Sequence, residues 1–364
     1  MTVERRKFLK TAALAGAGAG IAAPAIAQSS PKIQWRLASS FPKSLDTIYG
    51  AVDIFAKAVS DMTDGNFKIQ TFAAGEIVPG PGVLEATQNG TVEVGETALY
   101  YFWGKDPTFA LGTAIPFGLN PRQQNAWFYN GDGNKLMDEF LKGYNLKGLP
   151  GGNTGTQMGG WFRKEIKTVA DLKGLKFRIG GMGGAVLSKL GVVPQSIPGG
   201  DIYPSLEKGT IDAAEWVGPY DDLKLGFNKV APYYYYPGFW EGGANLHYIF
   251  NLEKYNQLPK NYQAILDAAA SVSNIWMQSK YDADNPAALK SLVANGTKLR
   301  PFSQEILEAS YKAAQELYKE LSAKNANFKK IYDNMHEFQN NEYLWWQVAE
   351  FTYDNFMVRQ RAKG

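Results

Sequence analysis

The chain has 364 residues, with 38 lysines and arginines against 35 aspartates and glutamates, and a formal net charge of +3. This length suggests about two domains, and so small a basic surplus argues against nucleic-acid binding. The absence of cysteine excludes disulfides, thiolate metal sites and cysteine nucleophiles, and two histidines leave little material for histidine metal sites or acid–base chemistry.

The first 27 residues have the features of an export signal. The basic residues Arg5, Arg6 and Lys7 precede a short, weakly apolar stretch at 11–23 and small residues at 24–27. The arginine pair resembles the twin-arginine type of signal. A membrane anchor is the alternative, but the apolar stretch is shorter than the ~20 residues of a span. We therefore expect cleavage after this segment and a protein free in the bacterial periplasm.

The export segment also accounts for the net charge. It holds four of the 38 basic residues and one of the 35 acidic residues, so 34 of each remain in the rest of the chain. A preference of the mature protein for anions must therefore come from a local site rather than from an overall field.

Strands and helices alternate along the rest of the chain. The patterns predict strands at 33–38, 67–72, 92–101 (a strand or turn), 145–151, 158–162, 175–179 and 213–217. They predict helices at 45–62, 83–88, 185–190, 202–208, 262–280, 304–324 and 328–361, and glycine-rich loops at 75–82 and 180–184. This alternation indicates α/β domains with mostly parallel sheets.

Motifs for catalysis are missing from the sequence. The chain has no G-x-S-x-G elbow and no Walker A loop, and the glycines at 180–184 do not have dinucleotide-binding spacing. His247 lies in an apolar stretch and is predicted to be a satisfied interior histidine, whereas His336 is predicted to be solvated. We therefore expect a binding protein rather than an enzyme.

Charged groups at the ends of two predicted strands suggest a binding site. Arg178 ends one strand and precedes glycines, and its planar guanidinium suits a carboxylate. Glu215 and Trp216 end another, and ligands of open α/β sheets bind beyond the carboxyl ends of strands. A structural ion pair at Arg178, and a packed Trp216 beside a surface Glu215, are the alternatives.

Carboxamides and aromatic side chains could complete this site. Asn153 and Gln157 lie on a glycine-containing loop and offer donors and acceptors without charge, although turn formation explains such residues equally well. The aromatic segments 100–103, 233–236 and 239–241 could wall a small pocket, with core packing as the alternative for most of them.

Several long segments resemble the extracytoplasmic solute receptors of tripartite ATP-independent periplasmic (TRAP) transporters. The resemblance covers essentially the whole chain after the export segment. Its marks are residues 35–42, 75–80, 171–179 and 203–216. Segments 151–163, 199–222 and 233–243 are most similar to the 2-oxo acid (pyruvate-type) subgroup.

The resemblance implies a periplasmic binding protein-like α/β fold. Two lobes joined by a hinge would close on one small anion, with a long helix lying across both. Lobe I is expected at 28–152 with about 243–285, and lobe II at 153–242 with about 286–327. The C-terminal helix at 328–364 is more broadly apolar than one stripe requires. It either builds a homodimer, as in relatives, or straps the lobes together.

The resemblance also implies roles for individual residues. Arg178 corresponds to the arginine that grips the ligand carboxylate. A bridging Na⁺, or alternatively Ca²⁺, would be held by Gln157, Glu215, the backbone of Trp216 and nearby Glu241. Further ligand contacts are expected from Trp216, Glu241 and three other residues, which are Tyr100, Tyr101 and Asn153.

A count of charges independently favours a cation, provided that these groups meet. Glu215, Glu241 and a ligand carboxylate would place three negative charges around Arg178. Unpaired buried charge is unfavourable, and a hard cation with oxygen ligands would offset the excess. A protonated glutamate is the competing solution.

The leading hypothesis is therefore a receptor that delivers a small 2-oxo monocarboxylate, such as pyruvate, to the small and large membrane subunits of a TRAP transporter. Lactate, a branched 2-oxo acid or a dicarboxylate are alternatives, although a dicarboxylate would need a second cationic group. A periplasmic enzyme acting on carboxylates and a carbohydrate-binding protein remain the hypotheses from other classes.

Overall fold

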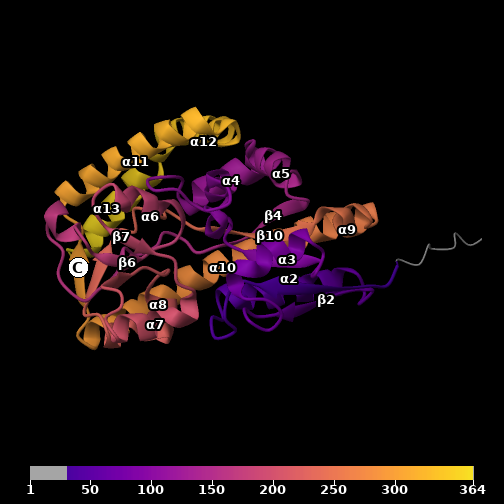
Figure 1. Ribbon diagram of the computed structural model, residues 1–364, viewed down its shortest axis with the longest axis horizontal. Helices are drawn as coiled ribbons and strands as arrows, with labels where there is room; N and C mark the ends of the chain where they lie inside the picture. Colours follow the sequence, from indigo (N-terminus) through magenta and orange to yellow (C-terminus); the bar gives the residue numbers. More distant parts are fainter. Residues whose placement is uncertain (1–30, 364) are drawn as a thin grey trace, which may run out of the picture.

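The computed structural model describes residues 31–363, and it contains two β-sheets flanked by helices (Figure 1). The export segment predicted at 1–27 lies outside the described residues. In the described part no helix is both long and apolar enough to cross a membrane. The two-lobed α/β architecture expected from the sequence is confirmed.

The first sheet has five strands and belongs to lobe I. In spatial order they are β2 (Phe67–Phe72), β1 (Ile33–Ser39), β3 (Val94–Thr97), β10 (Asn245–Asn251) and β4 (Leu146–Asn153). β1 is parallel to both of its neighbours, whereas β10 is antiparallel to β3 and β4. β10 therefore runs opposite to the other four strands, because the chain returns to this sheet from lobe II, and the expected mostly parallel sheet is confirmed.

The second sheet has six strands and belongs to lobe II. In spatial order they are β11 (Lys298–Pro301), β9 (Tyr233–Tyr236), β5 (Gly160–Phe162), β8 (Ala213–Ala214), β6 (Lys176–Arg178) and β7 (Val193–Gln195). This sheet is also mixed, since β5 is antiparallel to β8 and β9. The strand expected at 213–217 ends at Ala214, which frees the next residues to face the cleft.

Helices cover both sheets and also join the lobes. They are α2 (Ile48–Met62), α3 (Val83–Gln88), α4 (Pro121–Asn130), α5 (Gly133–Lys142), α6 (Gly181–Ser188), α7 (Gly199–Glu207), α8 (Pro219–Leu225), α9 (Leu252–Asn256), α10 (Lys260–Ala294), α11 (Gln304–Lys324), α12 (Ala326–Trp346) and α13 (Glu350–Arg361). The short 3-10 helices are η2 (Gly80–Gly82), η3 (Leu99–Phe102), η4 (Pro107–Gly112), η5 (Val169–Leu172) and η6 (Phe227–Lys229).

Helix α10 is the long helix that lies across both lobes (Figure 1). It contacts α2 and β4 in lobe I and α8 in lobe II. Its 35 residues extend well beyond the predicted 262–280. The sequence pattern missed the second half because that half contains Pro286 and has no single apolar stripe. A helix that contacts different elements along its length need not keep one hydrophobic face.

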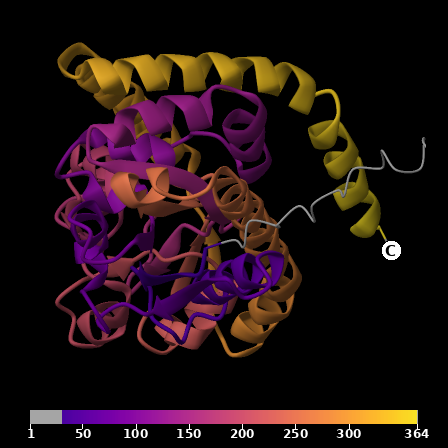
Figure 2. The same ribbon diagram turned by 90° about the vertical axis from the view of Figure 1, so that its right-hand side faces the viewer.

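Two helical predictions need correction. The glycine-rich segment 180–184 was expected to be a loop, but α6 begins at Gly181. An extra Cβ at Gly183 would stand 2.9 Å from the Trp240 side chain, so close packing favours glycine inside this helix. The single helix expected at 328–361 is two helices, α12 and α13. Figure 2 shows α12 lying over the body and α13 turning away from it.

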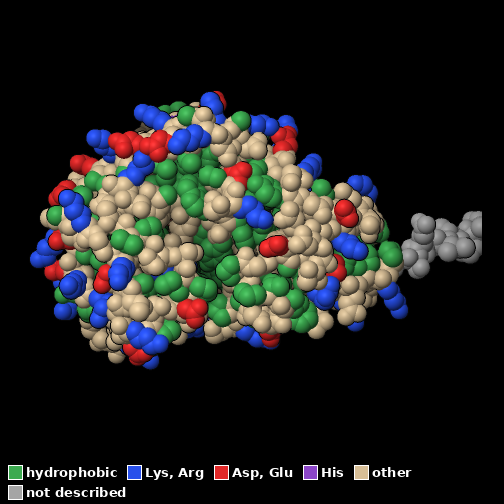
Figure 3. Space-filling view, in the orientation of Figure 1, with side chains coloured by type: hydrophobic (Ala, Val, Ile, Leu, Met, Phe, Trp, Pro, Cys, Tyr) green, Lys and Arg blue, Asp and Glu red, His purple; other side chains and the backbone are tan. Residues whose placement is uncertain are grey.

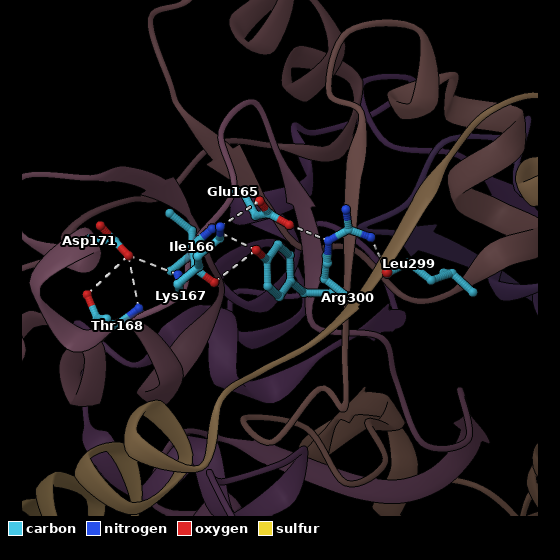
Figure 4. A network of polar contacts seen from close by, with 8 residues as sticks. Glu165, Ile166, Lys167, Thr168, Asp171, Leu299 and Arg300 are labelled. Atoms are coloured by element: carbon cyan, nitrogen blue, oxygen red, sulfur yellow. Dashed lines mark hydrogen bonds and ion pairs between the residues drawn. The ribbon is translucent and has the colours of Figure 1, made fainter.

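A polar network away from the cleft fastens β11 to the segment after β5 (Figure 4). Arg300 on β11 pairs with Glu165, and the hydroxyl of Tyr235 exchanges hydrogen bonds with the backbone of Ile166 at 2.6 and 2.9 Å. Nearby, Asp171 accepts from backbone amides at the start of η5. These contacts order the outer edge of lobe II and do not reach the cleft residues.

Candidate functional site

The register of lobe II brings Arg178 and Glu215 together. Strands β6 and β8 are parallel neighbours and pair Arg178 with Ala214, so Glu215 follows directly beside the arginine. The two side chains are 4% and 0% exposed and form an ion pair. Arg178 Nη1 also donates to the backbone carbonyl of Glu215 at 2.9 Å, and Nε donates to the carbonyl of Ile197 at 3.0 Å.

Glu215 is only partly satisfied by these contacts. Its Oε1 accepts from Arg178 and, at 2.9 Å, from the amide of Gly180. Its buried Oε2 has no hydrogen-bond partner among residues 31–363. Burial raises the pKa of Glu215, while Arg178 and the Gly180 amide oppose the rise. Burial also lowers the pKa of Arg178, but Glu215, Tyr101, Tyr100 and Glu241 together raise it above its usual value, so the guanidinium stays charged.

A second acid and a carboxamide come from the segments that join the lobes. Gln157 lies between β4 and β5, and Glu241 lies between β9 and β10. These segments bond to each other, since the Gly238 amide donates to the Gln157 carbonyl at 3.0 Å and the Thr154 amide donates to the Ala244 carbonyl at 3.1 Å. The fold therefore places Gln157 and Glu241 side by side where the chain crosses between lobes.

Both of these side chains are buried and have unused oxygen atoms. Gln157 Nε2 donates to Thr154 Oγ1 at 3.1 Å, but Gln157 Oε1 and Glu241 Oε2 have no partner in the described part of the chain. Burial raises the pKa of Glu241 far above its usual value and the Glu215 charge raises it further, whereas Arg178 and the side chains of Tyr100 and Gln157 lower it.

Aromatic side chains from both lobes enclose this polar group. Tyr100 and Tyr101 lie on η3, directly after β3 of lobe I, with their rings edge-on and 5.0 Å apart. The guanidinium of Arg178 lies 5.2 Å from the Trp216 ring, a cation–π arrangement. Burial raises the pKa of Tyr100 well above its usual value and that of Tyr101 to about 12, so both hydroxyls remain donors.

A cavity of about 510 Å³ opens beside these residues. Tyr100, Tyr101, Arg178 and Trp216 line it, and the same four residues line a small inner space of about 10 Å³. Gln157 borders only the inner space. Such an inner space is near the minimum for one water-sized particle. The larger chamber and the smaller space therefore adjoin at these four shared residues.

One predicted site residue faces elsewhere. Asn153 is fully buried, its Oδ1 accepts from the Gly155 amide at 3.0 Å and its Nδ2 donates to Gln124 Oε1 at 2.7 Å. It lines neither cavity and forms the turn that was its alternative explanation. Contacts, shared cavities or mutual charge effects bring the other predicted residues together. These residues are Tyr100, Tyr101, Gln157, Arg178, Glu215, Trp216 and Glu241.

Other aromatic and histidine residues that the sequence singled out lie in the core or on the surface. Tyr234 stacks on Trp161 in the core, as the packing alternative expected. His247 is interior, bonds to Asn245 at 3.0 Å, and burial lowers its pKa to about 3, whereas His336 is exposed. Sequence reasoning missed the cavity wall at 194–198, for which its two prolines were the only local signal.

The residues present fit a hard cation, although they do not form an all-protein cage. No cluster of three or more His, Cys, Asp or Glu side chains that could hold a metal occurs within 31–363. Three buried oxygens without partners do occur, on Gln157, Glu215 and Glu241. Carboxylate and carboxamide oxygens suit sodium or calcium, and a ligand carboxylate would add further oxygens.

Neither sign of charge dominates the face seen in Figure 3, where basic and acidic side chains are interspersed rather than gathered in one patch. This distribution agrees with the equal numbers of charges after the first 27 residues.

Comparison with known proteins matches residues 38–325 to the DctP family, described as bacterial extracellular solute-binding protein, family 7. The chain is 49% identical over 360 residues to a monocarboxylate 2-oxoacid-binding periplasmic protein of Nostoc sp., covering 97% of this chain and 99% of that protein. The family match includes the strands of both sheets except residues 33–37 of β1.

Solved structures of similar proteins have the same fold. A TRAP transporter solute-binding protein of Bordetella bronchiseptica, a dimer with calcium and picolinate, has 51% identity and a TM-score of 0.90 over 92% of this chain and 99% of that one. One from Pseudoalteromonas atlantica, with sodium and pyruvate, has 40% identity and a TM-score of 0.86 over 89% and 99%. The chain therefore belongs to the DctP family of TRAP transporter solute-binding proteins, which are receptors and not enzymes.

Proposed function

We propose that this chain binds a small 2-oxo monocarboxylate of the pyruvate type between its lobes. The observation that carries the proposal is a single buried guanidinium, Arg178, bordered by three buried oxygens without partners. The guanidinium would bind the ligand carboxylate through its planar donors. The names of the similar proteins from Nostoc and Pseudoalteromonas, which specify 2-oxoacid and pyruvate, support the same ligand class.

A cation would complete the site together with the ligand. Gln157, Glu215, the backbone carbonyl of Trp216 and Glu241 would hold sodium or calcium, and the bound cation supplies positive charge and coordination for oxygens. The two glutamates and the ligand would otherwise leave two negative charges uncompensated beside Arg178. Burial of such charges is unfavourable, so ligand and cation are expected to bind together.

Calorimetric titration with pyruvate tests both parts of this proposal. Affinity should fall at least tenfold when Na⁺ is replaced by choline and divalent ions are removed with a chelator. Arg178→Lys should weaken binding because the two-pronged donor geometry is lost. Arg163→Lys, an exposed arginine of lobe II, is the matched control. Full pyruvate affinity in Arg178→Ala would contradict the carboxylate role, and cation-independent affinity would contradict the metal role.

Related carboxylates form the second group of candidates. Lactate and branched 2-oxo acids have the same single carboxylate and would use Arg178 in the same way. A thermal-shift panel of small acids, with and without Na⁺ and Ca²⁺, ranks them because binding to the folded state raises the melting temperature. A shift with sugars and none with carboxylates would favour carbohydrate binding instead.

The lobes and their location follow from the same proposal. We infer that the lobes, at 28–152 with 243–285 and 153–242 with 286–327, close about the connecting segments that carry Gln157 and Glu241. The protein would act in the periplasm and deliver its ligand to the small and large TRAP membrane subunits. Fractionation of the producing bacterium and uptake in a strain lacking those subunits test the two statements separately.

The C-terminal helices support a homodimer. Trp345, Phe351, Phe356 and Val358 are all more than half exposed, and such an apolar surface is uncommon on a monomer. We infer that a second copy covers it, and the solved Bordetella relative is described as a dimer. A monomeric mass by light scattering at micromolar concentration would contradict this. It would favour the alternative, in which the C-terminal helix straps the two lobes together.

A further inference from the structure

The loop that follows β1 in lobe I contacts lobe II at two separate points. Near the cleft, the Phe41 ring lies 6.4 Å from the ring of Trp216, which lines the chamber beside Arg178. Six residues later, Thr47 contacts Asp221, which lies on α8 shortly after Trp216 in the chain. The same two segments therefore meet both beside the ligand site and away from it.

The contact between Thr47 and Asp221 is fully buried. Both residues are 0% exposed, and Thr47 Oγ1 donates to Asp221 Oδ1 at 2.7 Å. Tyr281 on α10 donates to the other carboxylate oxygen, Oδ2, at 2.6 Å. A movement that parts Thr47 from Asp221 removes one of these two donors from an interior carboxylate, which is unfavourable. The bond therefore favours the arrangement in which the two lobes touch.

A second contact between the lobes lies beside the first and is partly exposed. Asp46 forms an ion pair with Lys224 near the end of α8, and it accepts a hydrogen bond from the hydroxyl of Tyr220 at 3.1 Å. Lys280 of α10 lies 3.6 Å from the same carboxylate. The Asp46 side chain is half exposed, so water weakens these charge contacts. We therefore expect them to contribute less than the buried bond.

These residues act at a distance from the ligand. Asp46, Thr47 and Asp221 do not line the chamber or the inner space beside Arg178. The loop before α2 belongs to lobe I and α8 belongs to lobe II, so opening of the lobes separates the atoms that these bonds join. Any effect on binding must therefore come through the arrangement of the lobes, because affinity scales with the fraction of receptor in the binding-competent state.

We propose that Asp46 and Thr47 form an interlobe latch with Tyr220, Asp221 and Lys224 of α8, and that this latch holds the closed lobes together and sets how long the ligand stays bound. Asp46 and Thr47 are positioning residues that do not contact the ligand. The proposal rests on the carboxylate binding and lobe closure proposed above. A contact that is made only in the closed arrangement slows dissociation and leaves association nearly unchanged.

Stopped-flow tryptophan fluorescence with pyruvate, in the presence of Na⁺, tests the buried part of the latch. Thr47→Val keeps the branched shape and removes the hydroxyl donor. It should raise the dissociation rate at least fivefold and change the association rate less than twofold. Thr47→Ser restores a hydroxyl and should stay within about twofold of the unmodified protein in both rates.

The exposed part of the latch is tested in the same way. Asp46→Asn should raise the dissociation rate about two- to threefold. The double variant Asp46→Asn/Lys224→Met should dissociate no faster than the single variant by more than about twofold, because the two residues act as a pair. Asp61→Asn is the matched control and should change neither rate, since Asp61 forms an exposed ion pair with Lys57 inside lobe I.

The outcomes separate the latch from the function on which it rests. Unchanged dissociation in both Thr47→Val and Asp46→Asn, with pyruvate binding that still needs Arg178, would overturn the latch alone. Equal acceleration in Thr47→Ser and Thr47→Val would overturn the role of the hydroxyl. Slower association without faster dissociation would contradict a contact that belongs to the closed arrangement. Failure of the unmodified protein to bind any small carboxylate would overturn the proposed function itself.

Discussion

Two pairs of buried acids differ in how the fold satisfies them. Asp221 and Asp222 begin α8, and their four carboxylate oxygens all accept hydrogen bonds. Glu215 and Glu241 border the cleft and each keeps a buried oxygen without a partner among residues 31–363. Both pairs carry a desolvation penalty, but protein hydrogen-bond donors offset this penalty fully only for the first pair. Incomplete satisfaction beside Arg178, rather than burial alone, therefore distinguishes the two acids that we propose to hold a cation.

The donors to the first pair show what a structural acid does. Asp221 accepts from Thr47 at 2.7 Å, before α2, and from Tyr281 on α10 at 2.6 Å. Asp222 accepts from Trp161 at 2.9 Å and Tyr234 at 2.6 Å. Burial raises the pKa values to about 6 and about 7, and these hydrogen bonds oppose the rise. Asp221 thereby joins a loop of lobe I to lobe II and to the long helix.

The largest effect on this contrast should come from Arg178→Met. Removing the guanidinium leaves Glu215 buried without its ionic partner, so the free energy of unfolding should fall by about 3–5 kcal/mol, and carboxylate binding should be lost. Urea denaturation measures the first effect and calorimetry the second. In the double variant Arg178→Met/Glu215→Gln much of the stability should return. A single variant as stable as the unmodified protein would show that the pair is not held as an ion pair.

A smaller loss of stability, without a loss of affinity, is expected for Asp222→Ala. The change leaves buried donors of Trp161 and Tyr234 unpaired, so unfolding should become easier by about 2–3 kcal/mol. Ligand affinity, measured well below the melting temperature, should change less than threefold. A large drop in affinity at unchanged stability would place Asp222 among the ligand-binding acids. It would contradict the distinction between structural acids and acids of the cleft.

Glu241→Gln should give the opposite pattern. The amide keeps the shape of a carboxyl group whose pKa burial raises far above its usual value, so the unfolding free energy should change by less than about 1 kcal/mol. The stimulation of ligand binding by Na⁺ or Ca²⁺ should largely disappear. The exposed Glu320→Gln serves as the control for charge removal. Cation-stimulated binding that survives in Glu241→Gln would remove this residue from the metal site.

A pH-dependent effect concerns a third kind of buried acid. Glu96 accepts one hydrogen bond from Ser39 at 2.6 Å, and burial raises its pKa from 4.5 to about 8. Between these two pH values the folded protein holds a proton that the unfolded chain has released, so stability falls as the pH rises through the window. Glu96→Gln should flatten this fall by on the order of 1 kcal/mol for each pH unit of the window.

Melting temperatures of both proteins from pH 5 to pH 8.5 measure that difference. The unmodified protein should lose more stability than Glu96→Gln over this range. Parallel curves would show that Glu96 does not keep its proton in the folded state. In that case a bound proton would not compensate Glu96 for the hydrogen-bond donors that it lacks and that Asp221 and Asp222 have. The burial of Glu96 would then need another explanation.

Local sequence patterns predicted much of the fold. Helix α11 matches its predicted limits at Gln304–Lys324, and β1 and β2 match to within one residue. These elements have regular apolar spacing and clear ends. The patterns missed the first turn of α6, which contains several glycines, and the second half of α10, which contains Pro286. In both cases tertiary contacts stabilise a helix that intrinsic propensity disfavours.

The site was partly predictable for a similar reason. Arg178 and Glu215 could be proposed because each ends a strand, where ligands of open sheets bind. Gln157 and Glu241 depended on the resemblance to a known family, since nothing local distinguishes them from turn residues. Asn153 shows the limit of such reasoning, because its carboxamide is consumed by Gly155 and Gln124.

The sequence by itself determined the class of protein, through its resemblance to a known family, and the neutral balance of charge after residue 27. It also suggested the strand-end arginine as the group that we propose binds the anion. These inferences need only the composition and the order of residues along the chain. Only the tertiary structure decided which oxygens remain without partners, that the two connecting segments meet, and how much empty space lies beside Arg178. Such properties depend on groups distant in the chain, and close packing of the whole fold sets them.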